Sequence, residues 1–119
     1  MIATLSSVKV SCLLVNYFSV DTLAMALESV FLQQLTNTAL HFELDVVVVD
    51  NSLNLQEAQL LKNTIADLQR QATNPLSVQL ILNLSNTGFG EANNLAFKQC
   101  QGEFVMLLNP DAHMQFAAG

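Results

Sequence analysis

The feature that most constrains the fold is the run DVVVVD at residues 45–50. Four consecutive valines favour a β-strand, because branched side chains suit the pleated backbone. A strand that is apolar on both faces is typical of a parallel sheet covered by helices on both sides. The run therefore predicts a layered α/β fold before any other segment is considered.

The rest of the chain alternates between strand and helix patterns around this run. Apolar runs predict three more strands, and apolar spacing of three and four residues predicts three helices. Residues 35–43 and the segment NLSNTGFG are expected to be loops, and Gly102 is expected to end the last helix. The predicted elements are strand 8–15, helix 20–34, strand 45–50, helix 56–72, strand 78–82, helix 92–100 and strand 103–108. This order predicts one domain over residues 1–119, a three-layer α/β/α fold with a mainly parallel, Rossmann-like sheet and right-handed crossovers.

Composition narrows the classes of partner. The formal net charge is −6, and the few basic residues form no run that could follow a nucleic-acid backbone or anchor a helix to a membrane surface. Those residues are Lys9, Lys62, Arg70 and Lys98. No apolar run approaches the roughly 20 residues needed to span a bilayer. We therefore expect no nucleic-acid partner and no transmembrane segment.

The two cysteines are isolated from each other in the sequence. Cys12 lies in a predicted strand and Cys100 in a predicted helix. Such a pair does not make a disulfide framework, so buried free thiols are expected. Free thiols fit the reducing cytoplasm.

Polar segments follow each predicted strand. These segments are Asn16-Tyr17, Asp50-Asn51-Ser52, Asn83 to Gly90, and Asn109-Pro110-Asp111. In open parallel sheets the ligand binds beyond the carboxyl ends of the strands, where such segments converge. Each segment alone is compatible with an ordinary turn, but together they predict a binding site at this edge.

A dinucleotide-binding fingerprint is a second interpretation of one of these segments. Residues 88–93, GFGEAN, begin like that fingerprint, and Asp111 follows at a suitable distance. However, Asn93 occupies the third glycine position, Glu91 would face the pyrophosphate, and the loop follows the third strand. A nicotinamide-dependent oxidoreductase is therefore disfavoured. We keep only the expectation of a glycine turn that begins a helix.

Four sequence blocks stand out along the chain: VSCLLVNYFSVDTLAMALESV, DVVVVDNSLN, NLSNTGFGEANNLAF and GEFVMLLNPDA. They resemble glycosyltransferase family 2, most closely its rhamnosyltransferase-like branch. They occur in the order and spacing of that family, and the resemblance covers about residues 8 to 114. It implies a GT-A fold whose amino-terminal half binds a nucleotide-diphosphate sugar.

The resemblance also implies roles for individual residues. Asn16 and Tyr17 would lie beside the nucleoside, Asp50 would hydrogen-bond the base, and Asn51 and Ser52 would complete that turn. The nucleotide-sugar pocket would also involve Asn86, Gly88, Ala92 and Asn94. Asn109 and Asp111 match the outer positions of the DXD motif, which would hold Mg²⁺ or Mn²⁺ against the diphosphate and stabilise its developing charge.

The chain departs from the family pattern in several places. Asn109 replaces an aspartate and brings no charge to the metal, and Asn93 stands where many members carry arginine. His113 and His41 receive no role. The family's acceptor site and catalytic base are not recognisable, so we assign no catalytic residue and expect a truncated donor-binding half that is inactive in transfer by itself.

Two functions remain open from the sequence. The first is donor binding for inverting transfer of a sugar to a cell-envelope polysaccharide or another glycan, in the cytoplasm or peripherally at the inner face of the membrane. The second is a non-catalytic interaction module on the same fold. A sheet that ends after its fourth strand would expose apolar surface and an unpaired edge, which favours a homodimer or a complementing chain.

Overall fold

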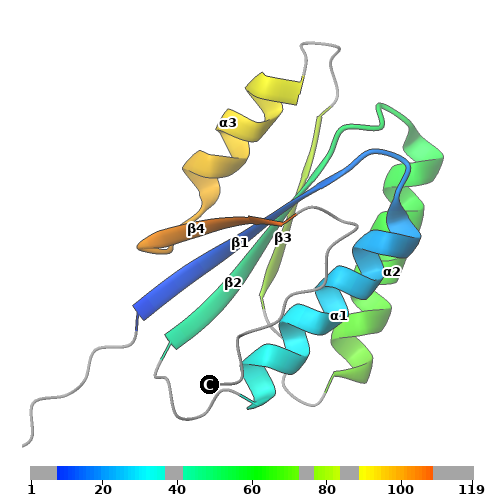
Figure 1. Cartoon of the computed structure of the whole chain (residues 1–119). Helices are drawn as coiled ribbons and strands as arrows, with labels where there is room; N and C mark the ends of the chain where they lie inside the picture. The colour runs from blue at the N-terminus through cyan, green and yellow to red at the C-terminus, as the bar shows by residue number, and fades with distance from the viewer. Residues whose placement is uncertain (1–7, 37–41, 73–76, 84–88, 109–119) are drawn as a thin grey trace, which may run out of the picture.

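The structure of the chain is a computed structural model that describes residues 8–36, 42–72, 77–83 and 89–108. Strands and helices alternate strictly through these residues (Figure 1). The elements are β1 Val8–Asn16, α1 Val20–Thr36, β2 Phe42–Asp50, α2 Leu55–Gln71, β3 Val78–Leu82, α3 Phe89–Gln99 and β4 Phe104–Leu108. The predicted number, type and order of elements are confirmed.

The four strands form one parallel sheet in the order β3-β2-β1-β4. The longest pairing joins β1 to β2, from Val8 opposite Phe42 to Asn16 opposite Asp50. Because all strands run the same way, their carboxyl ends meet at one edge of the sheet. The predicted parallel α/β fold is therefore confirmed.

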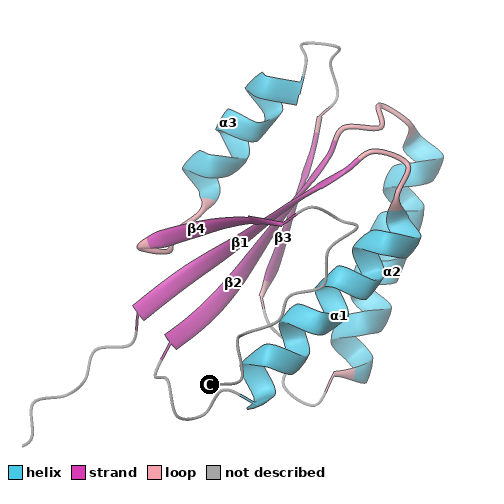
Figure 2. Cartoon of the chain, in the orientation of Figure 1, coloured by secondary structure: helices cyan, strands magenta, loops and turns pink. Residues whose placement is uncertain are grey.

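Helices cover both faces of this sheet, which makes three layers (Figure 2). The valines of β2 alternate between the two sides: Val46 and Val48 pack in the core under α1 and α2, while Val47 and Val49 pack with Ala96 of α3. All four valines are at most 1% exposed. Burial on both faces is what the unbroken valine run predicted.

The boundaries of β2 and α3 differ from the predictions. β2 begins at Phe42, inside the expected loop 35–43, because β1 provides a pairing partner along its whole length. α3 ends at Gln99, before Cys100, so Gly102 does not end the helix. A Cβ at Gly102 would lie 2.6 Å from the backbone nitrogen of Ser11, so glycine is required there by close packing against β1.

Two smaller predictions can also be checked. Both cysteines are free, with Cys12 buried and Cys100 half-buried. Within the described ranges, no helix is long and apolar enough to cross a membrane.

Candidate functional site

The carboxyl edge of the sheet brings together polar residues from the ends of β1, β2 and β3. Asn16 and Asp50 are register partners, and the backbone of Asn51 donates to the carbonyl of Asn16 over 2.8 Å. On the other side of β2, the backbone of Asn83 donates to the carbonyl of Asp50 over 2.9 Å. The predicted convergence of the first three strand ends is therefore confirmed. The fourth segment, residues 109–111, lies outside the described residues.

The Asp50 carboxylate is the centre of this cluster. It is 3% exposed. Its Oδ1 accepts from Asn16 Nδ2 at 3.0 Å and from the Ser52 backbone N–H at 3.1 Å, and its Oδ2 accepts from the Ser52 hydroxyl at 3.0 Å. A carboxylate offers about four acceptor positions. The donors among the described residues therefore leave one position, on Oδ2.

Asn16 is fully buried, and its side chain makes every hydrogen bond that it can make. One N–H of Nδ2 donates to Asp50, and Nδ2 also donates to Glu57 Oε2 at 3.0 Å. The amide oxygen accepts from the backbone N–H and the hydroxyl of Ser19, at 3.1 and 3.2 Å. Since both donors and both acceptors are used, this side chain holds Asp50 in place and has nothing left to offer a ligand.

Asn51 differs from Asn16 because one of its groups has no partner. It is 1% exposed, and its Oδ1 accepts from Asn83 Nδ2 at 3.0 Å. Its Nδ2 finds no acceptor in the part of the chain that the structure describes. A buried donor without a partner is costly, so this amide is available to an acceptor that the described residues do not supply.

The two loops that leave β1 and β2 hold strained backbone. Phe18 has φ 52° and Leu53 has φ 56°, in the left-handed region that side chains other than glycine rarely adopt. Such strain is often found at functional sites. The first loop also carries two exposed aromatic rings. Tyr17 and Phe18 are 57% and 55% exposed, and their rings meet edge to face with centroids 5.1 Å apart.

A small hollow of about 210 Å³ opens beside Asp50, between the end of β3 and the start of α2. Its polar lining residues are Asp50, Asn54 and Asn83. Its apolar lining residues are Leu53, Leu55, Ala58 and Leu82. Asp50 is therefore a buried residue that lines a space at the carboxyl edge of the sheet.

Not every predicted site residue can be placed. Asn86, Gly88, Asn109 and Asp111 lie outside the described residues, so their roles stay predictions. Ala92 lies in α3, and Asn94 is exposed on the same helix. Since α3 covers the sheet face opposite α1 and α2 (Figure 2), Asn94 lies across the sheet from the contact between Asn16 and Glu57.

Sequence reasoning missed Glu57, which lies in the first turn of α2. Asn83 was predicted at this edge as part of the polar segment Asn83 to Gly90, but without a role of its own. The spacing of Asn54 and Glu57 matches a helix capping box, and Asn54 Oδ1 does accept from the Glu57 backbone N–H at 2.8 Å. That signal would have drawn attention to Glu57, but only the fold brings its carboxylate to Asn16.

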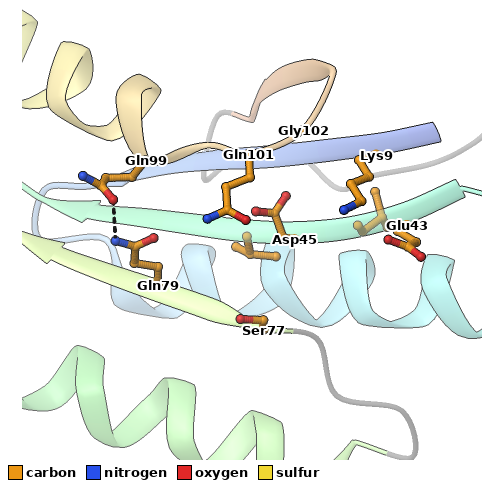
Figure 3. A pocket seen from close by; sticks show the side chains of 10 residues that line it. Lys9, Glu43, Asp45, Ser77, Gln79, Gln99, Gln101 and Gly102 are labelled. Atoms are coloured by element: carbon orange, nitrogen blue, oxygen red, sulfur yellow. Dashed lines mark hydrogen bonds between the residues drawn. The ribbon is translucent and has the colours of Figure 1, made fainter. Parts of the chain in front are cut away.

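A second, larger hollow of about 270 Å³ lies toward the opposite edge of the sheet (Figure 3). The labelled side chains around it include Lys9, Glu43, Asp45 and Gln101, and Gln79 donates to Gln99 at 3.2 Å. Lys9, Glu43 and Gln101 are exposed. This hollow lies at the amino ends of the strands, away from the edge where open parallel sheets bind ligands.

The fold and the polar residues at its carboxyl edge together define a parallel α/β domain with a buried carboxylate at the carboxyl edge of the sheet. The chain belongs to glycosyl transferase family 2, whose model matches residues 11–117. A match over nearly the whole chain agrees with the family resemblance of the four sequence blocks. Neither the curated proteins nor the solved structures in the comparison gave a match.

Proposed function

We propose that the carboxyl edge of the sheet binds a nucleotide-diphosphate sugar as the donor for glycosyl transfer. The observation that carries this proposal is the state of Asp50: a buried carboxylate, held by three donors, with one acceptor position left among the described residues, in a residue that also lines a hollow. Membership of glycosyl transferase family 2 supports a sugar donor as the ligand. The exposed rings of Tyr17 and Phe18 add a surface on which a base can stack.

The number of free acceptor positions also favours one type of base. Uracil and thymine present a single imide N–H between two carbonyl groups, which suits a carboxylate with one position left. Guanine presents two adjacent donor groups, which would require both carboxylate oxygens. Since Oδ1 already accepts two internal hydrogen bonds, we expect UDP or dTDP to bind more tightly than GDP.

Several finer parts of the proposal rest on the resemblance. They are the rhamnosyltransferase-like branch, a cell-envelope glycan as acceptor, and Mg²⁺ or Mn²⁺ held by Asn109 and Asp111. The metal would neutralise charge on the diphosphate. A cytoplasmic location is proposed because both cysteines are free, as in a reducing compartment.

Calorimetric titration of UDP, dTDP and GDP into the chain tests this function, with each nucleotide measured in Mn²⁺ and again in EDTA. We expect saturable binding of UDP or dTDP that Asp50→Ala abolishes and that Glu43→Ala, at the opposite edge, leaves unchanged. Weaker binding in EDTA would support the metal. No binding of any nucleotide would contradict the proposed function.

A second candidate function is association through the β4 edge. β4 is one of the two outer strands of the described sheet, and Phe104 and Leu107 on it are 62% and 59% exposed. Apolar side chains on an outer strand favour pairing with another chain. Light scattering at tens of micromolar should show a dimer that Leu107→Lys dissociates, whereas a monomer at that concentration would contradict association.

A further inference from the structure

We propose that Glu57 is a positioning residue for the Asp50 carboxylate and acts through the side chain of Asn16. This inference rests on the proposed function, in which Asp50 accepts from the base. Glu57 is half-buried in the first turn of α2. Its Oε2 accepts from the same nitrogen, Asn16 Nδ2, that donates to Asp50, each over 3.0 Å. One amide group therefore joins two carboxylates from different elements.

The Glu57 side chain does not make the hydrogen bond that is usual for a glutamate at this helix position. In a capping box the glutamate at this position turns back to the N–H of the cap residue. Here the cap residue is Asn54, and its N–H donates to the Ser52 hydroxyl at 3.3 Å. The Glu57 carboxylate instead reaches Asn16. The helix start is thus linked to the end of β1.

The link fixes the orientation of the Asn16 amide from all sides. Its nitrogen lies between two carboxylates, and its oxygen faces the N–H and hydroxyl of Ser19. Rotation of the amide would bring its oxygen against a carboxylate and leave buried groups unpaired, which is costly. With Glu57 in place, Asp50 Oδ1 stays occupied, and the acceptor on Oδ2 keeps a defined direction.

Two conservative variants separate this role from a simple effect of charge at a helix start. Glu57→Gln keeps the length of the side chain and an oxygen that can accept from Asn16, but it loses the charge. Glu57→Asp keeps the charge near the positive end of the helix dipole but withdraws the oxygen by one methylene group. If Glu57 positions Asn16, its side chain must be long enough to contact the amide. If Glu57 only stabilises the helix start, its negative charge must be kept.

The experiment measures UDP and dTDP affinity by calorimetry for the wild type, both variants, and the control pair Glu43→Gln and Glu43→Asp. We expect Glu57→Asp to weaken binding about three- to tenfold, the effect of one lost hydrogen bond. Glu57→Gln should stay within about twofold of the wild type, as should both controls. Thermal unfolding of each variant confirms that it is folded.

Each alternative result has a distinct meaning. If Glu57→Asp binds like the wild type, or if Glu57→Gln is the weaker of the two, the positioning role is wrong while the nucleotide site stands. If the wild type binds none of the nucleotides, the proposed function fails and the role of Glu57 fails with it.

Discussion

Two aspartates on β2 each accept a hydrogen bond from the residue directly opposite on β1, yet their surroundings differ. Ser11 donates to Asp45 at 2.5 Å, and Asn16 donates to Asp50 at 3.0 Å. Asp50 is 3% exposed and accepts two further bonds from Ser52. Asp45 is half-buried and borders the hollow shown in Figure 3.

The pair of Ser11 and Asp45 differs from the pair of Asn16 and Asp50 in its access to water. The difference separates a polar surface from a carboxylate whose orientation is fixed before any ligand binds. Water can reach Asp45 and satisfy its remaining acceptors. Asp50 is buried away from water, so the protein must supply donors, and the residues that the structure describes supply all but one. A buried acceptor that is directed in advance loses little freedom when a ligand binds. This is why our proposal places ligand binding at Asp50 and its partner Asn16, and not at Asp45.

Removing the Asp50 or the Asp45 carboxylate by substitution should give the largest difference in the free energy of unfolding. Asp50→Ala leaves the Asn16 amide, the Ser52 N–H and the Ser52 hydroxyl without their acceptor, so we expect a loss of about 2 to 4 kcal/mol in the free energy of unfolding. Asp45→Ala should cost about 1 kcal/mol, because water can replace the carboxylate. Urea unfolding followed by circular dichroism measures both.

Asp50→Asn is the second variant at this site, since it keeps the shape and one acceptor oxygen. The free energy of unfolding of Asp50→Asn should lie between that of the wild type and that of Asp50→Ala. Equal losses at Asp45 and Asp50 would mean that burial does not distinguish the two pairs.

A smaller effect is expected at Gly102, which lies in the turn between α3 and β4 and contacts Ser11 on β1, the hydrogen-bond partner of Asp45. The Gly102 N–H donates to the Ser11 hydroxyl at 2.8 Å, and a Cβ there would lie 2.6 Å from the Ser11 backbone nitrogen. Gly102→Ala forces β1 and this turn apart, at a cost of about 1 to 3 kcal/mol. Its neighbour Gln101 is exposed, so Gln101→Ala should change stability by less than about 0.5 kcal/mol. A neutral Gly102→Ala would show that the turn can move without cost.

The fold was largely predictable because its signals are local. The valine run 46–49 predicted burial on both faces, and all four valines are buried. The start of β2 was not predictable in the same way. Glu43 is exposed and interrupts the apolar pattern, and only pairing with Lys9 of β1 extends the strand to Phe42.

The site was predictable in its position but not in its internal contacts. Parallel strands bring their carboxyl ends together, so Asn16, Asp50 and Asn51 could be placed at one edge from their order alone. The contact between Asn16 and Glu57 joins residues 41 positions apart. This contact depends on how α2 packs across the sheet, and the spacing of residues along the sequence does not predict that packing.

The smallest effect should appear with pH and depends on the charge of Asp45. Burial, together with the negative charges of Asp45 and Cys100, raises the pKa of the Cys12 thiol from 9.0 to about 12. Above pH 9 the unfolded chain loses this proton while the folded chain keeps it. The unfolded state is then favoured, so stability should fall as pH rises from 9 toward 12, by about 1 kcal/mol at pH 10.

Urea unfolding at pH 7, 9 and 10 tests this decline, and two variants separate its causes. Cys12→Ala lowers stability at every pH because it leaves a cavity, but it should remove the part of the alkaline decline that belongs to this thiol. Asp45→Asn removes the larger of the two charge effects and should make the decline shallower, since burial and Cys100 then raise the thiol pKa without Asp45. An unchanged decline in both variants would assign it to other groups. A decline that only Cys12→Ala removes would show that the charge of Asp45 does not contribute to the raised pKa of the Cys12 thiol.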